Sequence, residues 1–383
     1  MTRKVALVSV SRADRAMAAA VGAALTAEGV NVAAIVVDDP SGPDSVIEDH
    51  GLRTRRIPAH MDGDDPAALG RRMGVLTGAF AEAIEAERPD IVVLTGDRYE
   101  TLAAAGAAAL SGTVIAHLHG GEVTLGAMDD AFRHAISKLA HLHFCATEAA
   151  RERLARLGEA DWRITVSGAP GLDRLHHARP LSRPDFFAAL NWRDPGGFIL
   201  VTWHPETLAP EGGAAGLKAL LDALNGSERP VLFTGVNADP GGLDQGARIR
   251  RWAEGREGVR LVPSLGSLYA SALAHAAAMA GNSSSGIIEA ATFALPVVDV
   301  GGRQAGRDRG ANVVHAPTDP AAVARALNRA LDPAFRAGLS GMANLYGDGR
   351  AAPRIAARLA GEPLDDRLRR KPFPAEEPAH DPK

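Results

Sequence analysis

Short runs of apolar, β-branched residues alternate with longer stretches rich in Ala, Leu, Arg and Glu along most of this chain. That alternation is typical of βα units built around a parallel sheet. Most of the runs are apolar throughout, as expected when helices cover both faces of a sheet. In the first half we predict strands at residues 5–10, 32–37, 91–95, 114–118, 142–146 and 164–167, and helices that include 66–87, 99–110 and 127–139.

The pattern begins again after a proline-rich stretch at residues 168–195, which we interpret as the connection between two domains. At 383 residues the chain is long enough to form two hydrophobic cores. We therefore predict an α/β protein with two Rossmann-like domains, at residues 1–175 and 190–345, and a cleft between them. The second set of strands is expected at 198–203, 231–236, 260–262, 277–281, 297–300 and 313–315.

Composition excludes several classes of protein. Hydrophobic residues make up 46% and charged residues 23%, the balance of a globular chain. A net charge of −4 argues against a nucleic-acid partner, which needs a basic surface. The single cysteine, Cys145, lies in an apolar run and is expected to be a buried small residue in a reducing compartment. The apolar stretch 5–10 is too short for a signal peptide, and no window approaches the roughly 20 apolar residues of a membrane span. We predict a cytoplasmic protein without a membrane partner.

Ligands of open parallel sheets bind beyond the carboxyl ends of the strands, so polar residues that follow apolar runs are candidates. After the first strand, Ser11 or Asp14 could cap a helix, whereas Arg12 could reach a phosphate. After residues 91–95, a glycine turn places Asp97 and Arg98 at the strand exit. A helix N-cap would explain Asp97 but not the arginine beside it.

The third candidate group follows residues 114–118 and contains His119, Glu122 and Asp129. Carboxylates that converge from neighbouring strands raise one another's pKa, which suits acid/base catalysis. The alternative is a set of surface salt bridges, with i,i+4 pairs between Asp129 and Arg133 and between Asp130 and His134. Five histidines lie nearby, but their spacing fits no usual zinc site, and we expect no metal. These histidines are His117, His119, His134, His141 and His143.

In the second half, His204 follows a strand and could donate to a substrate or a phosphate, so we place it among the catalytic candidates. The segment 281–289 is a small-residue loop that opens a helix, where backbone N–H groups and serine hydroxyls can hold an anion. Within it, Ser285 and Glu289 are i,i+4 neighbours, which leaves Glu289 in reach of ribose hydroxyls. Further on, Arg303 offers a cation to a diphosphate. Neither a Walker A loop nor a GxGxxG fingerprint is present, which disfavours NAD.

Taken together, these motifs resemble the hydrolysing UDP-N-acetylglucosamine 2-epimerases of sialic-acid and related nonulosonic-acid pathways. The segments that carry the resemblance occur in order: GDRYE, HLHGGEVTLGAMDD, RHAISKLAHLHF, the histidine of TWHPE, GNSSSGIIEA, GGRQAGR and YGDGRAAPRI. The resemblance implies a GT-B fold, in which a C-terminal helix crosses back to the first domain. The candidate is residues 350–360, within a crossover helix and tail at 346–383. It also suggests a homodimer or homotetramer.

The reaction that the resemblance implies uses no cofactor. A base removes the proton at carbon 2 of a UDP-linked N-acetylated amino sugar while UDP leaves, which gives a glycal. Water then adds, and the free 2-epimeric sugar is released. By motif position, Asp97 and Asp129 match acid/base carboxylates of the family. The positions that match nucleotide contacts, or belong to the anion-binding loop, are Arg12, Arg98, His204, Asn282, Ser284, Ser285, Glu289 and Arg303.

Three departures from the family pattern concern the sugar site. Some members carry a third carboxylate where this chain has His119, so either Glu122 replaces it or His119 acts itself, and we favour Glu122. Many relatives have a Gly-x-His-Leu loop where residues 37–42 stand here, and Arg15 occupies a position that is commonly aromatic. The sugar could be N-acetylglucosamine or a 2,4-diacetamido-trideoxyhexose. Two alternative functions stay open: a glycosyltransferase on the same fold, and a sugar-nucleotide-binding protein without catalysis.

Overall fold

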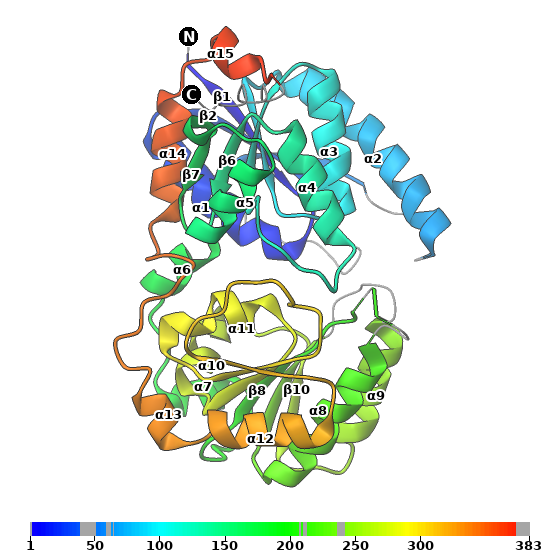
Figure 1. Ribbon diagram of the computed structural model, residues 1–383, viewed down its shortest axis with the longest axis vertical. Coiled ribbons are helices and arrows are strands. Elements are labelled where there is room, and N and C mark those ends of the chain that lie inside the picture. The colour runs from blue at the N-terminus through cyan, green and yellow to red at the C-terminus, as the bar shows by residue number, and fades with distance from the viewer. Residues whose placement is uncertain are drawn as a thin grey trace, which may run out of the picture. The chain divides into compact units, whose positions relative to one another are not determined.

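The computed structural model describes residues 2–38, 51–58, 63, 65–206, 208–209, 213–235 and 242–372, except for the side chains of Arg12 and Ala13. The chain divides into two compact units. The first contains Met1–Glu122, Ala131–Pro170 and Arg350–Lys383, and the second contains Val123–Asp130 and Gly171–Gly349. Each unit is built around one parallel sheet with helices packed against it (Figure 1).

In the described chain, the sheet of the first unit has seven strands in the order β3-β2-β1-β4-β5-β6-β7. The strands are β1 (Lys4–Ser9), β2 (Asn31–Val37), β3 (Arg53–Ile57), β4 (Ile91–Thr95), β5 (Val114–Leu118), β6 (Leu142–Cys145) and β7 (Ile164–Val166). The helices are α1 (Arg12–Ala27), α2 (Pro66–Glu87), α3 (Tyr99–Leu110), α4 (Asp129–Leu139), α5 (Glu148–Arg156), α14 (Ala351–Gly361) and α15 (Asp366–Arg369). The predicted strands are confirmed to within one residue at each end, and Cys145 is buried as expected.

Strand β3 is the one strand of this sheet that the sequence pattern did not predict. Its sequence, Arg-Thr-Arg-Arg-Ile, reads as a polar loop, yet it pairs with β2 along its whole length. The strand lies at the edge of the sheet, where charged side chains are tolerated. Arg53 and Arg55 both pair with Glu87 at the end of α2, and this contact between distant residues compensates for the missing apolar face.

The C-terminal helix belongs to the first unit. Helix α14 lies beside α1 in Figure 1, and its residues Ile355 and Leu359 are fully buried in a core shared with α1 and the sheet. Arg354 of the same helix donates to the carbonyl oxygen of Ser167, at 3.2 Å. The prediction that the helix at residues 350–360 crosses back to the first domain is therefore confirmed.

The second unit has a six-stranded sheet in the described chain, with the order β10-β9-β8-β11-β12-β13. The strands are β8 (Ile199–Thr202), β9 (Val231–Thr234), β10 (Val259–Val262), β11 (Ala278–Gly281), β12 (Val297–Val300) and β13 (Val313–Ala316). The helices are α6 (Gly171–His177), α7 (Arg183–Ala189), α8 (Ala214–Ser227), α9 (Gly242–Ala253), α10 (Tyr269–His275), α11 (Ser284–Ile288), α12 (Pro320–Ala330) and α13 (Pro333–Ala337). All six predicted strands are present.

The proline-rich stretch 168–195 contains two helices, α6 and α7, that the prediction missed. The boundary between the two units falls within this stretch, after Pro170. Pro184 stands in the first turn of α7, where proline is tolerated because its missing N–H would be unpaired anyway. Phe186 of α7 is buried and stacks on Phe198, with ring centroids 6.1 Å apart. The predicted connection does contain the boundary between the units, but most of the stretch belongs to the second unit.

Three sequence-based expectations fall on residues outside the described ranges. They are the end of the predicted strand at Val236, most of the altered loop 37–42, and the tail from residue 373 onward. Within the described residues, no helix combines the length and the apolar character needed to cross a bilayer.

Each sheet has one point where the strand order reverses, between β1 and β4 in the first unit and between β8 and β11 in the second. Crossovers leave a sheet in opposite directions at such a point, so the loops beyond the carboxyl ends of the two strands diverge and leave room for a ligand. The first switch point carries the loops that start at Val10 and Gly96. The second carries the loops that start at Trp203 and Asn282. Four candidate site residues, Asp97, Arg98, His204 and Asn282, belong to these loops, and Arg12, Ser284 and Ser285 lie at the starts of the helices that follow.

Candidate active site

Asp97 lies in the loop between β4 and α3, directly after Gly96. Gly96 has a φ of +82°, which the glycine adopts without strain and which turns the chain out of the strand. The N-cap position of α3 belongs to Arg98, so the interpretation of Asp97 as a plain helix cap does not hold. Instead, the Asp97 carboxylate forms an ion pair with Arg133 of α4. Arg98 pairs with Glu100 at 3.1 Å.

Arg133 is among the largest fully buried side chains of the described protein. One Nη donates to the carbonyl oxygen of Glu122 at 3.0 Å, and the other belongs to the ion pair with Asp97. The interpretation of Arg133 as part of a surface salt bridge is therefore wrong. A buried guanidinium needs a partner that offsets its desolvation, and here Asp97 is that partner.

His119 and Glu122 form a hydrogen-bonded pair in the loop after β5. The His119 Nδ1 and the Glu122 Oε1 atoms are 2.7 Å apart, and the Glu122 side chain is buried. His119 has a φ of +65°, an uncommon conformation for a residue with a side chain. Gly121 follows with a φ of +78°, and a Cβ there would overlap the carbonyl oxygen of Ala150 in α5. The His119 Nε2 atom is buried and has no hydrogen-bond partner among the described atoms.

His117 links this loop to the one that carries Asp97. Its Nε2 is 2.8 Å from the carbonyl oxygen of Gly96, and its Nδ1 is 3.1 Å from the Ser137 hydroxyl. A carbonyl oxygen only accepts, so Nε2 carries the proton and Nδ1 accepts from Ser137. Burial lowers the pKa of His117 to about 3, which keeps the ring neutral. His117 is therefore a positioning residue.

The other histidines near the site have separate structural partners. His141 Nδ1 accepts from the backbone N–H of Ile115 at 3.1 Å, and His143 Nε2 lies 2.9 Å from Glu159. Burial lowers the pKa of both rings, that of His141 to about 4. Among the residues that the structure describes, no three His, Cys, Asp or Glu side chains are grouped so as to hold a metal ion.

Asp14 is a further carboxyl group near Asp97. The sequence pattern indicated only a helix cap at this residue. The cap is confirmed, because Ser11 and Asp14 form a capping box at the start of α1. Asp14 is also buried beside Asp97 and Arg98. Burial raises its pKa to about 6, despite the hydrogen bond from Ser11 and the charge of Arg98. The sequence did not indicate that Asp14 lies near Asp97, because the two residues are more than 80 positions apart.

Two arginines of α1 were singled out in the sequence. Arg12 is the first residue of α1, but its side chain is outside the described part of the structure. Arg15 is fully buried, and its Nη2 donates to the carbonyl oxygen of Val37 at 3.3 Å. It therefore contacts the end of β2, where the altered loop 37–42 begins.

Asp129 is the first residue of α4, as the predicted helix implied to within two residues. The segment Val123–Asp130 that precedes most of this helix clusters with the second unit. Leu125 N donates to the carbonyl oxygen of Ala305 at 3.0 Å. A Cβ on Gly126 would overlap the backbone at Gly302, so only glycine allows this close approach. Asp130 closes the turn by accepting from Thr124 N at 2.7 Å.

In the second unit, Asn282 holds the backbone of His204. The Asn282 amide accepts from His204 N at 2.8 Å and donates to His204 O at 2.7 Å. The Asn282 side chain is fully buried, so we interpret it as positioning His204 rather than as offering its own side chain to a ligand. Gly281 has a φ of +137° and packs against the carbonyl oxygen of Thr202, which brings the two loops together.

The serines that follow Asn282 open a short helix, as expected. Ser283 is the N-cap of α11, and its hydroxyl lies 3.0 Å from that of Ser285. Glu289 N donates to Ser285 O at 2.9 Å, which confirms the predicted i,i+4 relationship. Arg303 is anchored over the start of this loop, since its Nη1 donates to Asn282 O at 3.2 Å and its Nε to Pro205 O at 3.2 Å.

Glu289 has neighbours that the sequence did not indicate. Burial raises the pKa of Glu289 to about 7, while the Tyr269 hydroxyl and the charge of Arg174 lower it. Tyr269 lies in α10 and Arg174 in α6, so both approach from elements distant in sequence. A carboxyl group with a pKa near neutrality is present in both its protonated and its ionised form at that pH, so it can donate or accept a hydrogen bond.

Glu206 is a further buried carboxyl group in the loop after β8 of the second unit. It follows His204 by two residues, and burial raises its pKa. Gly213 and Gly301 pack directly against its side chain, where a Cβ would approach within about 3 Å or less. The Oε1 atom of Glu206 has no hydrogen-bond partner among the described atoms. Glu206 belongs to the motif TWHPE, but the sequence did not indicate that Gly213 and Gly301 enclose its side chain.

Comparison with known proteins agrees with these motifs. The family model described as UDP-N-acetylglucosamine 2-epimerase matches residues 39–360. A GDP/UDP-N,N'-diacetylbacillosamine 2-epimerase (hydrolyzing) of Campylobacter jejuni is 37% identical over 264 residues, which cover 68% of this chain and 69% of that protein. A UDP-N,N'-diacetylbacillosamine 2-epimerase (hydrolyzing) of Legionella pneumophila is 35% identical over 317 residues, which cover 82% of each chain.

The fold is shared with solved structures of low sequence identity. The UDP-GlcNAc 2-epimerase of Neisseria meningitidis, solved with UDP-GlcNAc bound, has a TM-score of 0.81 at 18% identity. The alignment covers 94% of this chain and all of that one. Together, the family match over most of the chain and the two curated relatives show that this protein belongs to the UDP-N-acetylglucosamine 2-epimerase family.

Proposed function

We propose that this protein is a hydrolysing 2-epimerase that converts a UDP-linked N-acetylated amino sugar into UDP and the free 2-epimeric sugar. The observation that carries the proposal is a pair of acid/base units at the exits of adjacent strands. These units are Asp97 with Arg133, after β4, and His119 with Glu122, after β5. The family match supports the same reaction class.

The reaction has two stages, and each requires proton transfer at carbon 2. In the first, a base takes the proton from carbon 2, the bond between carbon 1 and the diphosphate oxygen breaks, and UDP leaves with the electron pair. The product of this stage is a glycal. In the second, the oxygen of water bonds to carbon 1 and gives up one proton to a base, while an acid delivers a proton to carbon 2 on the opposite face. Two or more positioned acid/base groups are needed for this sequence.

We assign proton transfer at carbon 2 to Asp97, Asp129 and the His119–Glu122 pair. Arg133 orients the Asp97 carboxylate through their ion pair. Glu122 accepts from His119 Nδ1–H, and this leaves Nε2 as the atom that exchanges a proton with the substrate. The pairing favours His119 as the reacting group and Glu122 as its orienting partner, in place of Glu122 acting alone.

We assign the nucleotide to the second unit. The phosphates would contact Ser284 and Ser285, at the start of α11, and Arg303, which lies beside it. Glu289 would accept hydrogen bonds from the ribose hydroxyls. His204, held by Asn282, would donate to the diphosphate as it leaves. Arg12 and Arg98 of the first unit remain proposed nucleotide contacts on the basis of motif position.

The sugar is proposed from the relatives. The Legionella protein is named for UDP-N,N'-diacetylbacillosamine, a UDP-linked diacetamido-trideoxyhexose, and the Campylobacter protein for the GDP- or UDP-linked form of the same sugar. We therefore propose this sugar nucleotide as the preferred substrate, with UDP-GlcNAc as the alternative. The departure of the sequence from the family pattern at residues 37–42 supports a sugar site that differs from that of enzymes acting on UDP-GlcNAc.

The test is incubation of the purified protein with each sugar nucleotide, without any acceptor, followed by chromatography and proton NMR. Free sugar inverted at carbon 2, in equal amount with UDP, supports the proposal. Release of UDP only after an acceptor is added would identify a glycosyltransferase. Measurable binding without turnover of either sugar nucleotide would identify a sugar-nucleotide-binding protein without catalysis.

We further propose a cytoplasmic homodimer or homotetramer. The buried, unpaired Cys145 is compatible with a reducing compartment. The resemblance to the family supports self-association. Light scattering coupled to size-exclusion chromatography tests the assembly, and a mass of one chain across micromolar concentrations would contradict it.

A further inference from the structure

Lys371, which follows α15, inserts its ammonium group into the first unit, at the end of α4. Its Nζ lies 3.0 Å from Ser137 O, 2.9 Å from Lys138 O and 2.6 Å from Ala140 O. The last carbonyl groups of a helix have no partner within the helix and carry its negative dipole end, so a cation there is stabilising. Lys371 is therefore a cap on α4, supplied from more than 200 residues away in sequence.

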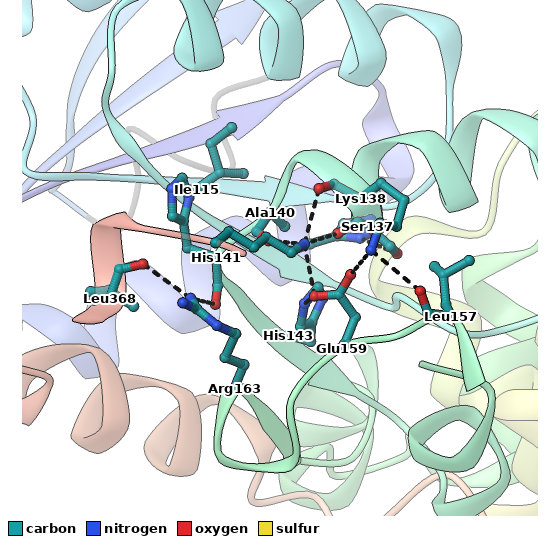
Figure 2. A network of polar contacts seen from close by, with 12 residues as sticks. Ile115, Ser137, Lys138, Ala140, His141, His143, Leu157, Glu159, Arg163 and Leu368 are labelled. Carbon is teal, nitrogen blue, oxygen red and sulfur yellow. Dashed lines mark hydrogen bonds and ion pairs between the residues drawn. The ribbon is translucent and has the colours of Figure 1, made fainter. Parts of the chain in front are cut away.

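A buried carboxylate holds Lys371 in this place. Glu159 pairs with Lys371 at 2.7 Å, with Lys138 at 2.8 Å and with His143 at 2.9 Å. Figure 2 shows Glu159 between Lys138 and His143, below the end of α4. Burial would raise the pKa of Glu159, but hydrogen bonds from these three side chains hold it at about 2, so the carboxylate is charged.

The segment that carries Lys371 is fixed by a second buried cation, Arg163. Its guanidinium donates to the carbonyl oxygens of Arg367, Leu368 and Arg370, at 2.8 to 3.0 Å. The contact with Leu368 is visible in Figure 2, next to His141. Arg163 therefore holds the backbone of α15 and of Arg370, the residue just before Lys371.

Helix α4 in turn is linked to the loop of Asp97 by two side chains one turn apart, directly through Arg133 and by way of His117 through Ser137. Arg133 pairs with Asp97, and Ser137 donates to His117, whose Nε2 holds Gly96 O. Both α4 side chains are fully buried. Since Ser137 contributes its hydroxyl to His117 and its carbonyl to Lys371, the polar contacts run without a gap from Lys371 to Gly96 and Asp97.

We propose that Lys371 is a positioning residue for the acid/base chemistry of Asp97: by capping α4 it sets the position of Arg133 and Ser137, and hence that of the Asp97 carboxylate. The inference rests on the proposed function where it takes Asp97 as an acid/base group. A residue that merely anchored the C-terminus would contribute to thermal stability but not to the rate of the chemical step.

The experiment compares Lys371→Met, Lys371→Arg and Lys138→Met in the full-length chain. Lys371→Met keeps the length of the side chain but removes the donors to α4. Lys371→Arg keeps a cation and donors. Lys138→Met is the matched control, because it also removes a partner of Glu159 but leaves the cap on α4 in place.

We expect Lys371→Met to lower kcat about tenfold, with KM and UDP affinity within twofold of wild type. Lys371→Arg should restore at least a third of the rate, and Lys138→Met should keep kcat. Assays are run well below the melting temperature of each variant. A Lys371→Met enzyme with wild-type kcat, or a control with the same loss of rate, would overturn the inference.

A second readout does not depend on turnover. Amide hydrogen exchange followed by mass spectrometry should be faster in Lys371→Met for peptides that contain the end of α4 and residues 94–98, and unchanged there in Lys138→Met. Faster exchange confined to the C-terminal segment would overturn the inference. If the wild-type protein shows no epimerase activity but this exchange pattern is observed, the proposed function fails while the positioning of Asp97 by Lys371 stands.

Discussion

The carboxylate of Asp97 pairs with the guanidinium of Arg133, a side chain that is 1% exposed, while the Asp97 side chain itself stays 27% exposed. One partner is thus locked in the protein, and the other is held at its surface within reach of a ligand. Such an arrangement restricts the carboxylate to one orientation without removing it from the substrate side. Asp97 is therefore the group on which the proposed proton transfer depends most.

Replacing Asp97 by Asn should lower kcat by roughly a hundredfold or more, the range found for removal of a general acid or base. The amide still accepts a hydrogen bond from Arg133, so the fold should be retained. UDP affinity, measured by calorimetry, should stay within twofold of wild type because Asp97 is not among the proposed nucleotide contacts. A variant with near-normal turnover would refute the assignment of Asp97.

His119 and Glu122 should act as one unit. His119→Asn and Glu122→Gln should each lower kcat by roughly a hundredfold, and the double variant should lose little more than either single one, because residues that act together are not additive. Steady-state kinetics on the four proteins gives the coupling. Full multiplication of the two effects would mean that the residues act independently.

Glu289 should make nucleotide binding depend on pH near neutrality. Its pKa is raised to about 7, so the carboxylate that accepts from ribose hydroxyls forms only as the pH rises through this value. UDP should bind about tenfold more tightly at pH 8 than at pH 6. In Glu289→Gln this contribution should disappear, and affinity at pH 8 should fall. A wild-type and a variant protein with parallel pH profiles would contradict the ribose role.

Asp14 should reduce stability at neutral and alkaline pH. Its pKa rises from 3.8 in the unfolded chain to about 6 in the fold, because burial disfavours the charged form. The folded state is therefore favoured by the protonated group at low pH, and this advantage is lost as the pH rises from about 4 to 6. A shift of about two units corresponds to about 3 kcal/mol.

Asp14→Asn should accordingly stabilise the protein at pH 8, by up to about 3 kcal/mol, and by clearly less at pH 5. The amide oxygen can still accept the backbone N–H groups of Val10 and Ser11 that Asp14 caps. Urea unfolding at the two pH values measures the difference. An equal effect at both would mean that burial of charge at Asp14 is not the cause.

Sequence pattern predicted the two sheets well because parallel strands buried on both faces are continuously apolar. It failed for β3, where Arg53 and Arg55 depend on Glu87 for their partners. Local motifs singled out Asp97, His119, Glu122 and Glu289 as candidates, and their roles stay predictions. They could not reveal that Arg133 orients Asp97, that Tyr269 and Arg174 adjoin Glu289, or that Lys371 caps α4, because each of these contacts joins residues far apart in the chain.

Heavy water offers the most direct measurement of the central claim, which is proton exchange at carbon 2 by Asp97 and the other proposed acid/base residues. The protein is incubated in D₂O with UDP-N,N'-diacetylbacillosamine or UDP-GlcNAc, and the released sugar is examined by NMR and mass spectrometry. We predict one deuterium at carbon 2 in every product molecule with wild-type protein, and no release or labelling above background with Asp97→Asn. Product that keeps its original hydrogen at carbon 2, or equal labelling by the variant, would contradict the claim.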